Sequence, residues 1–579
     1  MARYGLSKSR LIAWKQCPKR LWLQYHRPDI LEITDETEHR FQIGFEVGEV
    51  AQGLHSGGIL IEDNDDLSVA LASTRKAIDE YPNRPIFEAT FQHDGVLVRA
   101  DLMLPTSGGY RMVEVKSSTS VKPYHVDDCA IQAWVLKQNN IPLCSVELAH
   151  IDTSFVYRGA GDHQGLLRYE QLDDLIAPLM ADVPEWIQGA RNVLAGEEPN
   201  IEVGPQCDAP FECPFKTYCT RNIALNDTPE FSLDVFYRMH EPTKELLRSK
   251  GFEDACSVPD EYLNETQRWI QRVSRSGIAE LLPGAAMALT NLPYPRYYLD
   301  FETINLAVPR WVDTSPYSTQ VPFQWSCHIE TEMGELAHEM FLDVSGNDPR
   351  RACAEQMIAI LGNIGPIFVY YQAFEKARIT ELAALFFDLA PKLRAINERI
   401  VDLLPIARAN YYHPAMKGSW SIKAVLPTVA ADLDYTSLAV SGGGDAQDAY
   451  REILHPQTTV DRRLNLTAGL YEYCKLDTLA MVRLAWFFQG VQVYAFTDKN
   501  VVGEEDMNEK DNKNTRRSLA LNVLRQHCQT TQTKAIIGPV SLIQRHMRLG
   551  YSAALDLVAE LKAEGVLSVT SVVKHDKDR

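Results

Sequence analysis

Two carboxylates stand on one side of an apolar, aromatic segment in the middle of the chain. Residues 297–306 read YYLDFETINL, with one residue between Asp300 and Glu302. Side chains two positions apart on a β-strand point to the same face, so the segment predicts a buried strand with two neighbouring charges. Unpaired buried carboxylates are costly, and a bound divalent cation removes that cost. The stretch therefore predicts a metal site that needs further carboxylates from elsewhere.

Two later segments offer further groups for such a site. Glu375 lies in IFVYYQAFEKARITEL, which is typical of an apolar strand that enters a helix. Asp477 lies in the helical pattern YEYCKLDTLAMVRLAW, and Tyr473 precedes it by one turn on the same face. Asp402 and His413, in the segment VDLLPIARANYYHP, are weaker candidates that we expect to be structural.

This set resembles the DEDD exonucleases of the DnaQ-like, ribonuclease-H-like fold, whose motifs are DxE, a carboxylate after an Asn pattern, and Y-x3-D. The resemblance implies two Mg²⁺ or Mn²⁺ ions held by Asp300, Glu302, Glu375 and Asp477, with Tyr473 orienting the attacking water. Two positions depart from the family. Glu375 stands where Asp is usual, and Gln372 replaces the Asn, with one residue fewer. A degenerate fold with incidental carboxylates is the alternative.

A second candidate site lies near the N-terminus. Residues 96–118, VLVRADLMLPTSGGYRMVEVKSS, predict a strand, a Gly-rich turn and a second strand. Glu114 and Lys116 share one face of the second strand, and a hairpin brings Asp101 beside Glu114. Two carboxylates suit a hard cation, and the lysine can orient water or stabilise charge on a phosphate. Gln132 lies on the helical pattern that follows, and a surface ion pair between strands is the alternative.

These residues resemble the RecB-type PD-(D/E)XK nucleases, which have a restriction-endonuclease-like α/β fold. The resemblance assigns Asp101, Glu114 and Lys116 to metal binding and catalysis and Gln132 to the helical Gln motif. Leu136 departs from the Tyr that often ends that motif. The family's early metal-binding His is replaced by Gly48 in GFEVGEVAQGL, where Glu46 or Glu49 is a possible substitute.

Four of the eleven cysteines flank this site in the sequence. Cys17 lies in KQCPKRLWLQY, whereas Cys207, Cys213 and Cys219 lie in QCDAPFECPFKTYC. Four thiolates bind a zinc ion or a 4Fe–4S cluster, and the paired C-x2-C knuckles of a zinc ribbon are absent. The split pattern resembles the iron–sulfur subgroup of RecB-type nucleases, in which a structural cluster staples the two ends of the domain. Zinc, or unpaired core cysteines, are the alternatives.

The last 60 residues regain helical periodicity after a charged stretch. Residues 538–568 predict two helices around Gly550, typical of a winged helix. The pattern resembles the FtsK gamma domain, a reader of duplex DNA, at Gln544, Arg545, Gly550, Tyr551, Ala554, Leu561 and Gly565. Asp556 and Glu560 make the second helix acidic, so protein interaction or dimerisation is the alternative to DNA binding.

The sequence thus predicts an α/β multidomain protein with five parts. We expect a RecB-like domain at 1–225, a helical spacer at 226–292, a DEDD domain at 293–497, a linker at 498–518 and a winged helix at 519–579. The net charge of −19 excludes a general nucleic-acid coat, although the first 28 residues hold seven Lys and Arg and no acid. That basic stretch is a nucleic-acid contact or a solvated helix face. Neither a membrane span nor a signal peptide is expected, and we expect a cytoplasmic protein.

The function expected from both resemblances is a metal-dependent nuclease that acts on DNA, most simply as an exonuclease. DNA repair, defence against foreign DNA and trimming of DNA ends for CRISPR adaptation are settings that fit. An RNA 3′–5′ exonuclease is one alternative, because DEDD chemistry does not distinguish the sugars. A DNA-end binding or scaffold protein with decayed sites is the other, suggested by Gly48 and Glu375.

Overall fold

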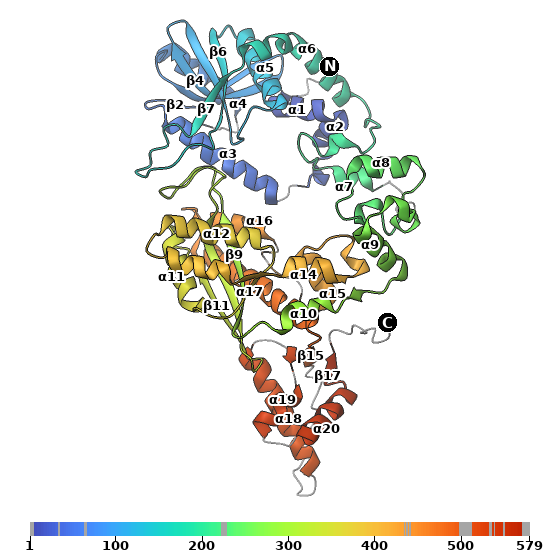
Figure 1. Ribbon diagram of the computed structural model, residues 1–579. Coiled ribbons are helices and arrows are strands. Elements are labelled where there is room, and N and C mark those ends of the chain that lie inside the picture. Colours follow the sequence, from blue (N-terminus) through green and yellow to red (C-terminus); the bar gives the residue numbers. More distant parts are fainter. Residues whose placement is uncertain are drawn as a thin grey trace. The chain divides into compact units, whose positions relative to one another are not determined.

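The computed structural model describes residues 5–32, 35–62, 66–221, 229–433, 435, 438, 440, 442–491, 493–496, 512–531, 535–537, 539–547 and 551–569. Within these ranges the chain is a mixed α/β protein with several sheets. Its contacts divide it into two compact units, Met1–Asp227 with Asn305–Gln320, and Thr228–Ile304 with Val321–Arg579 (Figure 1). Among the described helices, none has the length and apolar character needed to cross a membrane.

The first unit is built on a seven-stranded sheet in the order β2-β3-β4-β5-β6-β7, with β1 beside β4. Its strands are β1 (Leu6–Ser7), β2 (Ile59–Leu60), β3 (Ile86–His93), β4 (Val96–Thr106), β5 (Gly109–Lys116), β6 (Leu143–Ile151) and β7 (Leu167–Gln171). Its helices are α1 (Lys8–Gln16), α2 (Pro18–His26), η1 (Pro28–Ile30), α3 (Asp35–Gly53), α4 (Leu67–Glu80), α5 (Pro123–Gln138), α6 (Asp173–Ala195), η2 (Pro205–Cys207) and α7 (Lys216–Thr220). Both sheet faces are covered, because α5 packs on β3, β4 and β6 and α3 packs on β5.

The β4–β5 hairpin depends on one glycine. Gly109 has a φ of 144°, and a Cβ there would lie 2.2 Å from the carbonyl oxygen of Pro142. Glycine is the residue that tolerates such a backbone and such a close approach. The hairpin register pairs Leu102 with Val113, so the preceding residue of β4 lies beside Glu114, as the sequence predicts.

The second unit holds a five-stranded sheet in the order β11-β10-β9-β12-β13 and two smaller sheets, β14-β8 and β16-β15-β17. Its strands are β8 (Glu280–Leu281), β9 (Arg296–Ile304), β10 (Val321–Glu330), β11 (Leu336–Leu342), β12 (Ile367–Val369), β13 (Ile400–Asp402), β14 (Tyr411–Tyr412), β15 (Val493–Phe496), β16 (Ala535–Ile537) and β17 (Leu567–Val569). Strand β9 pairs antiparallel with β10 on one side and parallel with β12 on the other.

The helices of the second unit cover both faces of its main sheet. They are η3 (Leu233–Val235), α8 (Glu241–Ser249), η4 (Ala255–Ser257), η5 (Asp260–Tyr262), α9 (Glu265–Ser276), α10 (Gly284–Thr290), α11 (Arg350–Leu361), α12 (Gln372–Leu385), α13 (Ala390–Glu398), α14 (Leu403–Asn410), η6 (Pro414–Met416), α15 (Ile422–Val429), α16 (Gly443–Leu454), α17 (Val460–Phe488), α18 (Asn512–Thr531), α19 (Pro539–Met547) and α20 (Tyr551–Ala563). The apolar cluster on one face joins β9 to α11, α12 and α13, whereas α17 contacts β9 and β10.

Three boundaries differ from those expected from the sequence. The expected spacer packs within the second unit, since β8 pairs with β14. Residues 305–320, expected inside the DEDD domain, belong to the first unit. There the amide of Tyr157 donates to the carbonyl of Thr314 at 3.0 Å, and the hydroxyl of Tyr317 donates to the carbonyl of Ser117 at 2.5 Å. Of the expected linker, residues 498–511 lie outside the described residues, and residues 512–518 belong to α18. Strand β15, which precedes the linker in the chain, pairs with β16 and β17, which follow it.

Candidate functional site

The alternation of β9 sends its two carboxylates to one face of the sheet. Leu299 and Phe301 point into the apolar cluster with α11, α12 and α13. Asp300 and Glu302 point to the other face, where each has an oxygen within 4.8 Å of the thiol of Cys474 on α17. Asp300 is half-buried and Glu302 is buried. The strand predicted from YYLDFETINL is therefore present, with both carboxylates against α17.

Helix α17 brings the last sequence motif to this face. Tyr473 and Asp477 are both buried on it, one turn apart. Tyr473 hydrogen-bonds to the Asp477 carboxylate. The hydroxyl of Tyr435, from the segment before α16, donates to Asp477 Oδ1 at 2.6 Å. Two phenols therefore hold the carboxylate of Asp477 in place.

Glu375 reaches the same region from the first turn of α12, directly after the short strand β12. It is 3% exposed, and its Oε2 atom has no hydrogen-bond partner among the described residues. The start of this helix is fixed by Asp402, whose carboxylate accepts the amides of Tyr371 and Gln372 at 2.9 and 3.0 Å. Asp402 also caps α14 through the amide of Leu404, so its role in the structure is that of a capping residue.

His413 likewise makes a local backbone contact. Its Nδ1 atom accepts the amide of Ala415 at 3.1 Å and caps η6. Burial lowers the pKa of this imidazole. Asp402 and His413 thus both cap helices, the structural kind of role expected from the sequence.

Burial raises the pKa of all four central carboxyls, and neighbouring acids raise it further at Asp300 and Glu302. Burial, Asp477, Glu302 and Glu375 raise the pKa of Asp300 well above its usual range. Burial and Asp477 likewise raise the pKa of Glu302, which the charge of Lys423 opposes. Burial raises the pKa of Glu375 to about 8 and that of Asp477 to about 6. Neighbouring acids thus disfavour the ionised forms of Asp300 and Glu302, whereas burial is the main cause at Glu375 and Asp477.

Two residues near this cluster were not identified from the sequence. Lys423 follows the first residue of α15, and its charge favours the ionised forms of Glu302 and Asp477. Its ammonium lies 5.6 Å from the ring centroid of Tyr435 and 5.5 Å from that of Tyr473. Neither Lys423 nor Tyr435 forms a spacing motif with the carboxylates, so only the fold brings them there.

The central donor set suits a hard divalent cation. Four carboxylates offer oxygen ligands, which Mg²⁺ and Mn²⁺ prefer. Burial and the neighbouring acids raise the pKa of Cys474 far above its usual value, so this sulfur stays a neutral thiol and a poor ligand. The orphaned oxygen of Glu375 and the uncompensated charge both fit a cation at this position.

The N-terminal candidates also come together, on β4, β5 and α5. The pKa of Asp101 is raised to about 7 by burial and by the charge of Glu114, and its Oδ2 atom accepts the amide of Val115 at 2.7 Å. Glu114 is buried, and Gln132 Nε2 donates to its Oε2 atom at 2.6 Å. Lys116 Nζ donates to Glu114 Oε1 at 2.6 Å.

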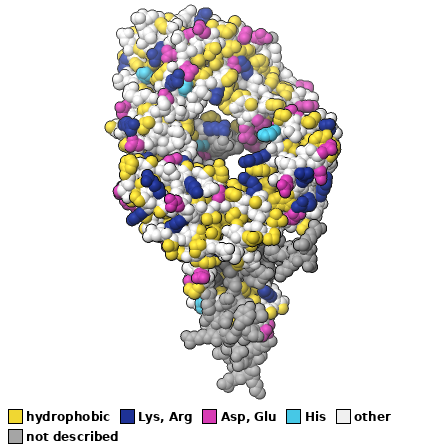
Figure 2. All heavy atoms as spheres, in the orientation of Figure 1, with side chains coloured by type: hydrophobic (Ala, Val, Ile, Leu, Met, Phe, Trp, Pro, Cys, Tyr) yellow, Lys and Arg dark blue, Asp and Glu magenta, His cyan; other side chains and the backbone are white. Residues whose placement is uncertain are grey.

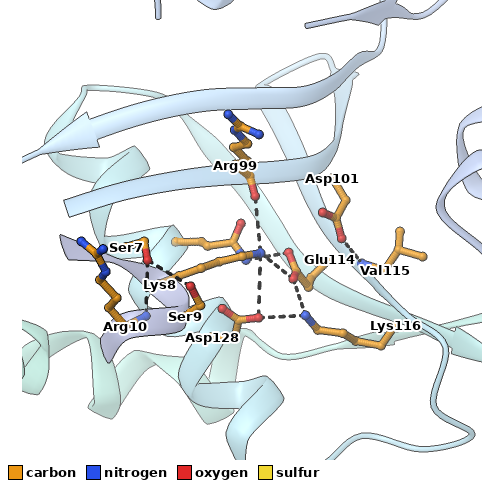
Figure 3. A network of polar contacts seen from close by, with 11 residues as sticks. Ser7, Lys8, Ser9, Arg10, Arg99, Asp101, Glu114, Val115, Lys116 and Asp128 are labelled. Atoms are coloured by element: carbon orange, nitrogen blue, oxygen red, sulfur yellow. Dashed lines mark hydrogen bonds and ion pairs between the residues drawn. The ribbon is translucent and has the colours of Figure 1, made fainter. Parts of the chain in front are cut away.

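Lys8 and Asp128 complete this cluster and were not identified as site residues from the sequence (Figure 3). Lys8 Nζ, from the first residue of α1, donates to Glu114 Oε1 at 2.7 Å. Asp128 Oδ2, one turn before Gln132 on α5, accepts Lys116 Nζ at 2.9 Å. Lys8 was visible in the basic N-terminal stretch, and Asp128 four residues before Gln132, but no spacing rule linked them to β5.

The electrostatics of the two clusters differ. The charges of Lys116 and Lys8 and the bond from Gln132 outweigh burial and hold the pKa of Glu114 well below its usual range. The lysines here supply positive charge that the central cluster lacks. Asp128 Oδ1 and Gln132 Oε1 are buried acceptors without a partner among the described residues, so a cation still fits beside them.

The expected early ligand is missing from α3. A Cβ at Gly48 would meet no atom within 4 Å, so the position is open rather than filled by a substitute. Glu49 is exposed, and no hydrogen bond or ion pair joins Glu46 or Glu49 to Glu114 in the described part of the chain.

A cavity of about 1240 Å³ opens beside the N-terminal cluster. Lys8, Lys116 and Asp128 form part of its wall. Its other basic and aromatic lining residues are Arg20, Arg40, Phe41, Tyr124, His125, Phe211 and Lys216, and Glu32 and Glu212 also line it. Basic and aromatic groups in one cavity suit a ligand with phosphates and flat rings.

The four flanking cysteines line one small cavity of the first unit. Cys17, Cys207 and Cys213 are buried and Cys219 is half-buried. Burial, together with the other three thiols, raises the pKa of Cys219, so the four sulfurs lie near one another. Four thiols that oppose one another's ionisation suit a positively charged metal or cluster.

Contacts made by side chains join the two cysteine segments. Gln16 Nε2 donates to the carbonyls of Gln206 and Phe211 at 2.8 and 2.7 Å. Lys19 pairs with Glu198 at 2.9 Å. The start and the end of the first unit are therefore joined around the thiols even without a bound group.

The C-terminal candidates lie on α19, α20 and the turns beside them. Gln544 and Arg545 are on α19, Tyr551, Ala554 and Leu561 on α20, and Gly565 follows α20, whereas Gly550 lies outside the described residues. Ala554, Val558 and Leu561 are buried in an apolar cluster with α18 and α19. Asp556 is exposed. The apolar face of α20 is thus used within this module, and its exposed side is acidic there.

Comparison with known proteins gives no established activity. A family model described as a domain of unknown function, DUF2779, matches residues 297–421. That range contains Asp300, Glu302 and Glu375 and ends before Lys423 and Asp477. An uncharacterized protein of Ureaplasma parvum, UU173, is 25% identical over 233 residues, which cover 36% of this chain and 33% of that protein. The chain thus spans about a third of the length of this relative.

The raised pKa of Glu375 predicts a pH-dependent stability in the absence of divalent cations. Its folded pKa of about 8 lies above the value of about 4.3 in an unfolded chain, so the folded state binds the proton more tightly. The free energy of unfolding should therefore fall from about pH 5 to about pH 8, by about 3–4 kcal/mol for this group alone. Urea unfolding in EDTA at several pH values measures it.

Glu375→Gln should reduce this fall, because the amide does not ionise. Glu381→Gln, on the same helix and 51% exposed, is the matched control and should leave the pH dependence unchanged. Identical pH dependence in wild type and Glu375→Gln would contradict the raised pKa of this carboxyl in the folded chain.

Proposed function

We propose that the chain is a metal-dependent nuclease whose central carboxylate cluster hydrolyses phosphodiester bonds as a DEDD exonuclease. The observation that carries the proposal is the convergence of Asp300, Glu302, Glu375 and Asp477 with raised pKa values and too little positive charge. A cluster of buried acids costs stability, and a site that binds cations gives that cost a function. Glu375 then serves as the third carboxylate in spite of its longer side chain.

The side chains around the cluster have separate tasks in this proposal. Bound Mg²⁺ or Mn²⁺ ions activate a water and stabilise the leaving oxygen. Tyr473 keeps its proton, because burial and Asp477 raise its pKa, and so acts as a hydrogen-bond donor that orients the water. Tyr435 fixes the rotamer of Asp477. Lys423 offers positive charge to the phosphate on the side of Glu302.

A cleft of about 580 Å³ in the second unit supports a nucleic-acid strand as the substrate. It is lined by aromatic side chains, among them Tyr237, Tyr370 and Tyr371, and by Arg408. Tyr371 is 58% exposed and directly precedes the helix that carries Glu375. Exposed aromatic rings stack on bases, and basic groups pair with the phosphates between them. The Arg408 guanidinium lies 4.9 Å from the ring centroid of Tyr237, so the charge and the ring belong to one wall of the cleft.

We further propose that the first unit is a RecB-type PD-(D/E)XK module. The cross-strand position of Asp101 and Glu114, with Lys116 and Gln132 on the same carboxylate, supports this assignment. The basic and aromatic cavity beside it supports a nucleic-acid ligand. The net charge does not oppose this, since Figure 2 shows basic and acidic side chains interspersed over the visible face.

The proposed folds are restriction-endonuclease-like for the first unit, ribonuclease-H-like for the main part of the second, and winged-helix for β15–β17 with α18–α20. The ribonuclease-H-like assignment is supported by the way α17 packs on β9 and β10, which joins the first and last carboxylate motifs. The winged helix is supported by three helices on a three-stranded sheet. Its partner is DNA or a protein, and the acidic exposed face of α20 favours the protein.

DNA is the proposed substrate, because the RecB-type resemblance favours it. The proposed settings are DNA repair, defence against foreign DNA and trimming of ends for CRISPR adaptation, with a cytoplasmic location.

Substitution at each centre should separate the two activities. With end-labelled single- and double-stranded DNA and RNA and Mg²⁺ or Mn²⁺, Asp300→Asn should lower exonuclease cleavage by about 10³-fold or more, because a carboxylate that would hold the cation is lost. Lys116→Ala should affect only cleavage by the first unit. Asp388→Asn, on an exposed carboxylate of the second unit paired with Arg351, is the matched control. Cleavage by both single variants at the wild-type rate would refute the site assignments, and cleavage of RNA alone would make RNA the substrate.

We propose that the four cysteines hold a structural 4Fe–4S cluster, with zinc as the second candidate for the same thiols. Anaerobically purified protein should be brown and contain about four iron atoms per chain. Cys213→Ser should lose most of that iron and lower the stability of the first unit. Cys353→Ser, at a buried thiol of the second unit, should retain the iron and is the matched control. Stoichiometric zinc without iron would contradict the cluster.

A further inference from the structure

The ammonium of Lys8 lies inside the N-terminal carboxylate cluster rather than on the surface (Figure 3). Its Nζ atom is 2.7 Å from Glu114 Oε1, 3.9 Å from Asp128 Oδ2 and 3.5 Å from the carbonyl of Arg99, and its side chain is 22% exposed. The most buried carboxylate of the cluster, Glu114, is 1% exposed. Lys8 thus contributes a full positive charge at the centre of the proposed first active site.

The local fold places Lys8 there. Strand β1 pairs in parallel with β4, with Leu6 opposite Val96, and α1 begins immediately after it. Ser7 caps this helix by accepting the amide of Arg10 at 3.3 Å. Lys8 is therefore the first helical residue, held next to the strand that carries Asp101. The position of its ammonium follows from backbone pairing and a cap, not from a flexible surface side chain.

Two lysines face three carboxylates in this cluster, those of Asp101, Glu114 and Asp128. Lys8 and Lys116 both donate to Glu114 Oε1, at 2.7 and 2.6 Å, and Lys116 also pairs with Asp128. Gln132 occupies the other oxygen of Glu114. Both oxygens of Glu114 therefore already have donors. A divalent cation that binds Glu114 brings two positive charges to a carboxylate that two ammonium groups already compensate, and it competes directly with an ammonium for Oε1.

We propose that Lys8 is an internal counter-ion of the N-terminal centre, which holds Glu114 when no cation is bound and must leave Glu114 Oε1 before a divalent cation binds. This inference rests on the proposed function, since it takes the first unit to be a cation-dependent centre. Lys8 is the lysine that moves, because Lys116 is also held by Asp128 at 2.9 Å whereas Lys8 lies 3.9 Å from that carboxylate. Lys8 is thus a positioning residue that lowers the cation affinity of its own site.

The orphaned acceptors of α5 are consistent with this exchange. Asp128 Oδ1 and Gln132 Oε1 are buried and have no partner among the described residues. With Lys8 on Glu114 they stay unsatisfied, which costs free energy. A cation and the waters it carries would supply the missing contacts while the ammonium moves into the adjoining cavity, whose wall Lys8 already forms.

Cation binding, rather than activity, tests the proposal. Mn²⁺ binding is measured by electron paramagnetic resonance in the full chain with Asp300→Asn and Asp477→Asn, which remove the central ligands. In this background the N-terminal site should bind one Mn²⁺ that Glu114→Gln abolishes. Lys8→Met should lower the Kd of that site by about tenfold or more, because a competing charge is removed.

Matched variants control for charge and for folding. Lys15→Met removes a lysine from the same helix, where it pairs with Asp127 on α5 at 2.6 Å, and should leave the Kd unchanged. Lys8→Gln keeps a hydrogen-bond donor for Glu114 without the charge, and should also bind Mn²⁺ more tightly than the parent. It serves in place of Lys8→Met if the latter fails to fold, as judged by circular dichroism.

The outcomes distinguish the proposal from the function on which it rests. A Glu114-dependent Mn²⁺ site whose Kd is unchanged or higher in both Lys8 variants would overturn the role of Lys8 and leave the proposed function standing. Absence of Glu114-dependent Mn²⁺ binding in every variant would overturn both the role of Lys8 and the assignment of a cation to the first unit.

Discussion

The repulsion among buried carboxylates on one face of β9 is the constraint on which the second unit depends. The pleat of this strand sends Leu299 and Phe301 into the apolar core and sends Asp300 and Glu302 towards α17. Helix α17 then adds Asp477 instead of a base. A chain selected only for stability would not gather buried acids whose ionised forms are disfavoured, and this is the reason a cation-binding function is proposed for them.

The first unit compensates a buried carboxylate with nearby positive charge. Its buried Glu114 is compensated by Lys8, Lys116 and Gln132, and the pKa of this carboxyl is lowered rather than raised. The two centres therefore differ in what they require of a cation. Under the proposed function, a cation at the central centre would relieve repulsion that is already present, whereas at the N-terminal centre it would have to replace an ammonium. The N-terminal cluster is thus expected to be the more stable of the two without metal, and the central cluster is expected to bind a cation more tightly.

The motif-bearing elements were predictable because their side-chain periodicity is local. The β9 strand, the β4–β5 hairpin and the helices that carry Gln132 and Asp477 agree with the patterns of the sequence. Lys423, Tyr435, Lys8 and Asp128 were not predicted as site residues, because only long-range packing brings them to the carboxylates. Likewise, the pairing of β15 with β16 and β17 spans a charged stretch that, by composition, predicts a boundary. Assignment of residues 305–320 to the first unit has no sequence signal at all.

The central claim is that Asp300, Glu302, Glu375 and Asp477 together bind divalent cations. Anomalous diffraction from crystals grown with Mn²⁺ tests it most directly, because manganese can be located independently of the protein atoms. The account predicts one or two anomalous peaks about 2.0–2.2 Å from oxygens of these carboxylates, with Tyr473 beside them. An absence of anomalous density there, with the four side chains paired instead to lysine or arginine, would contradict the account.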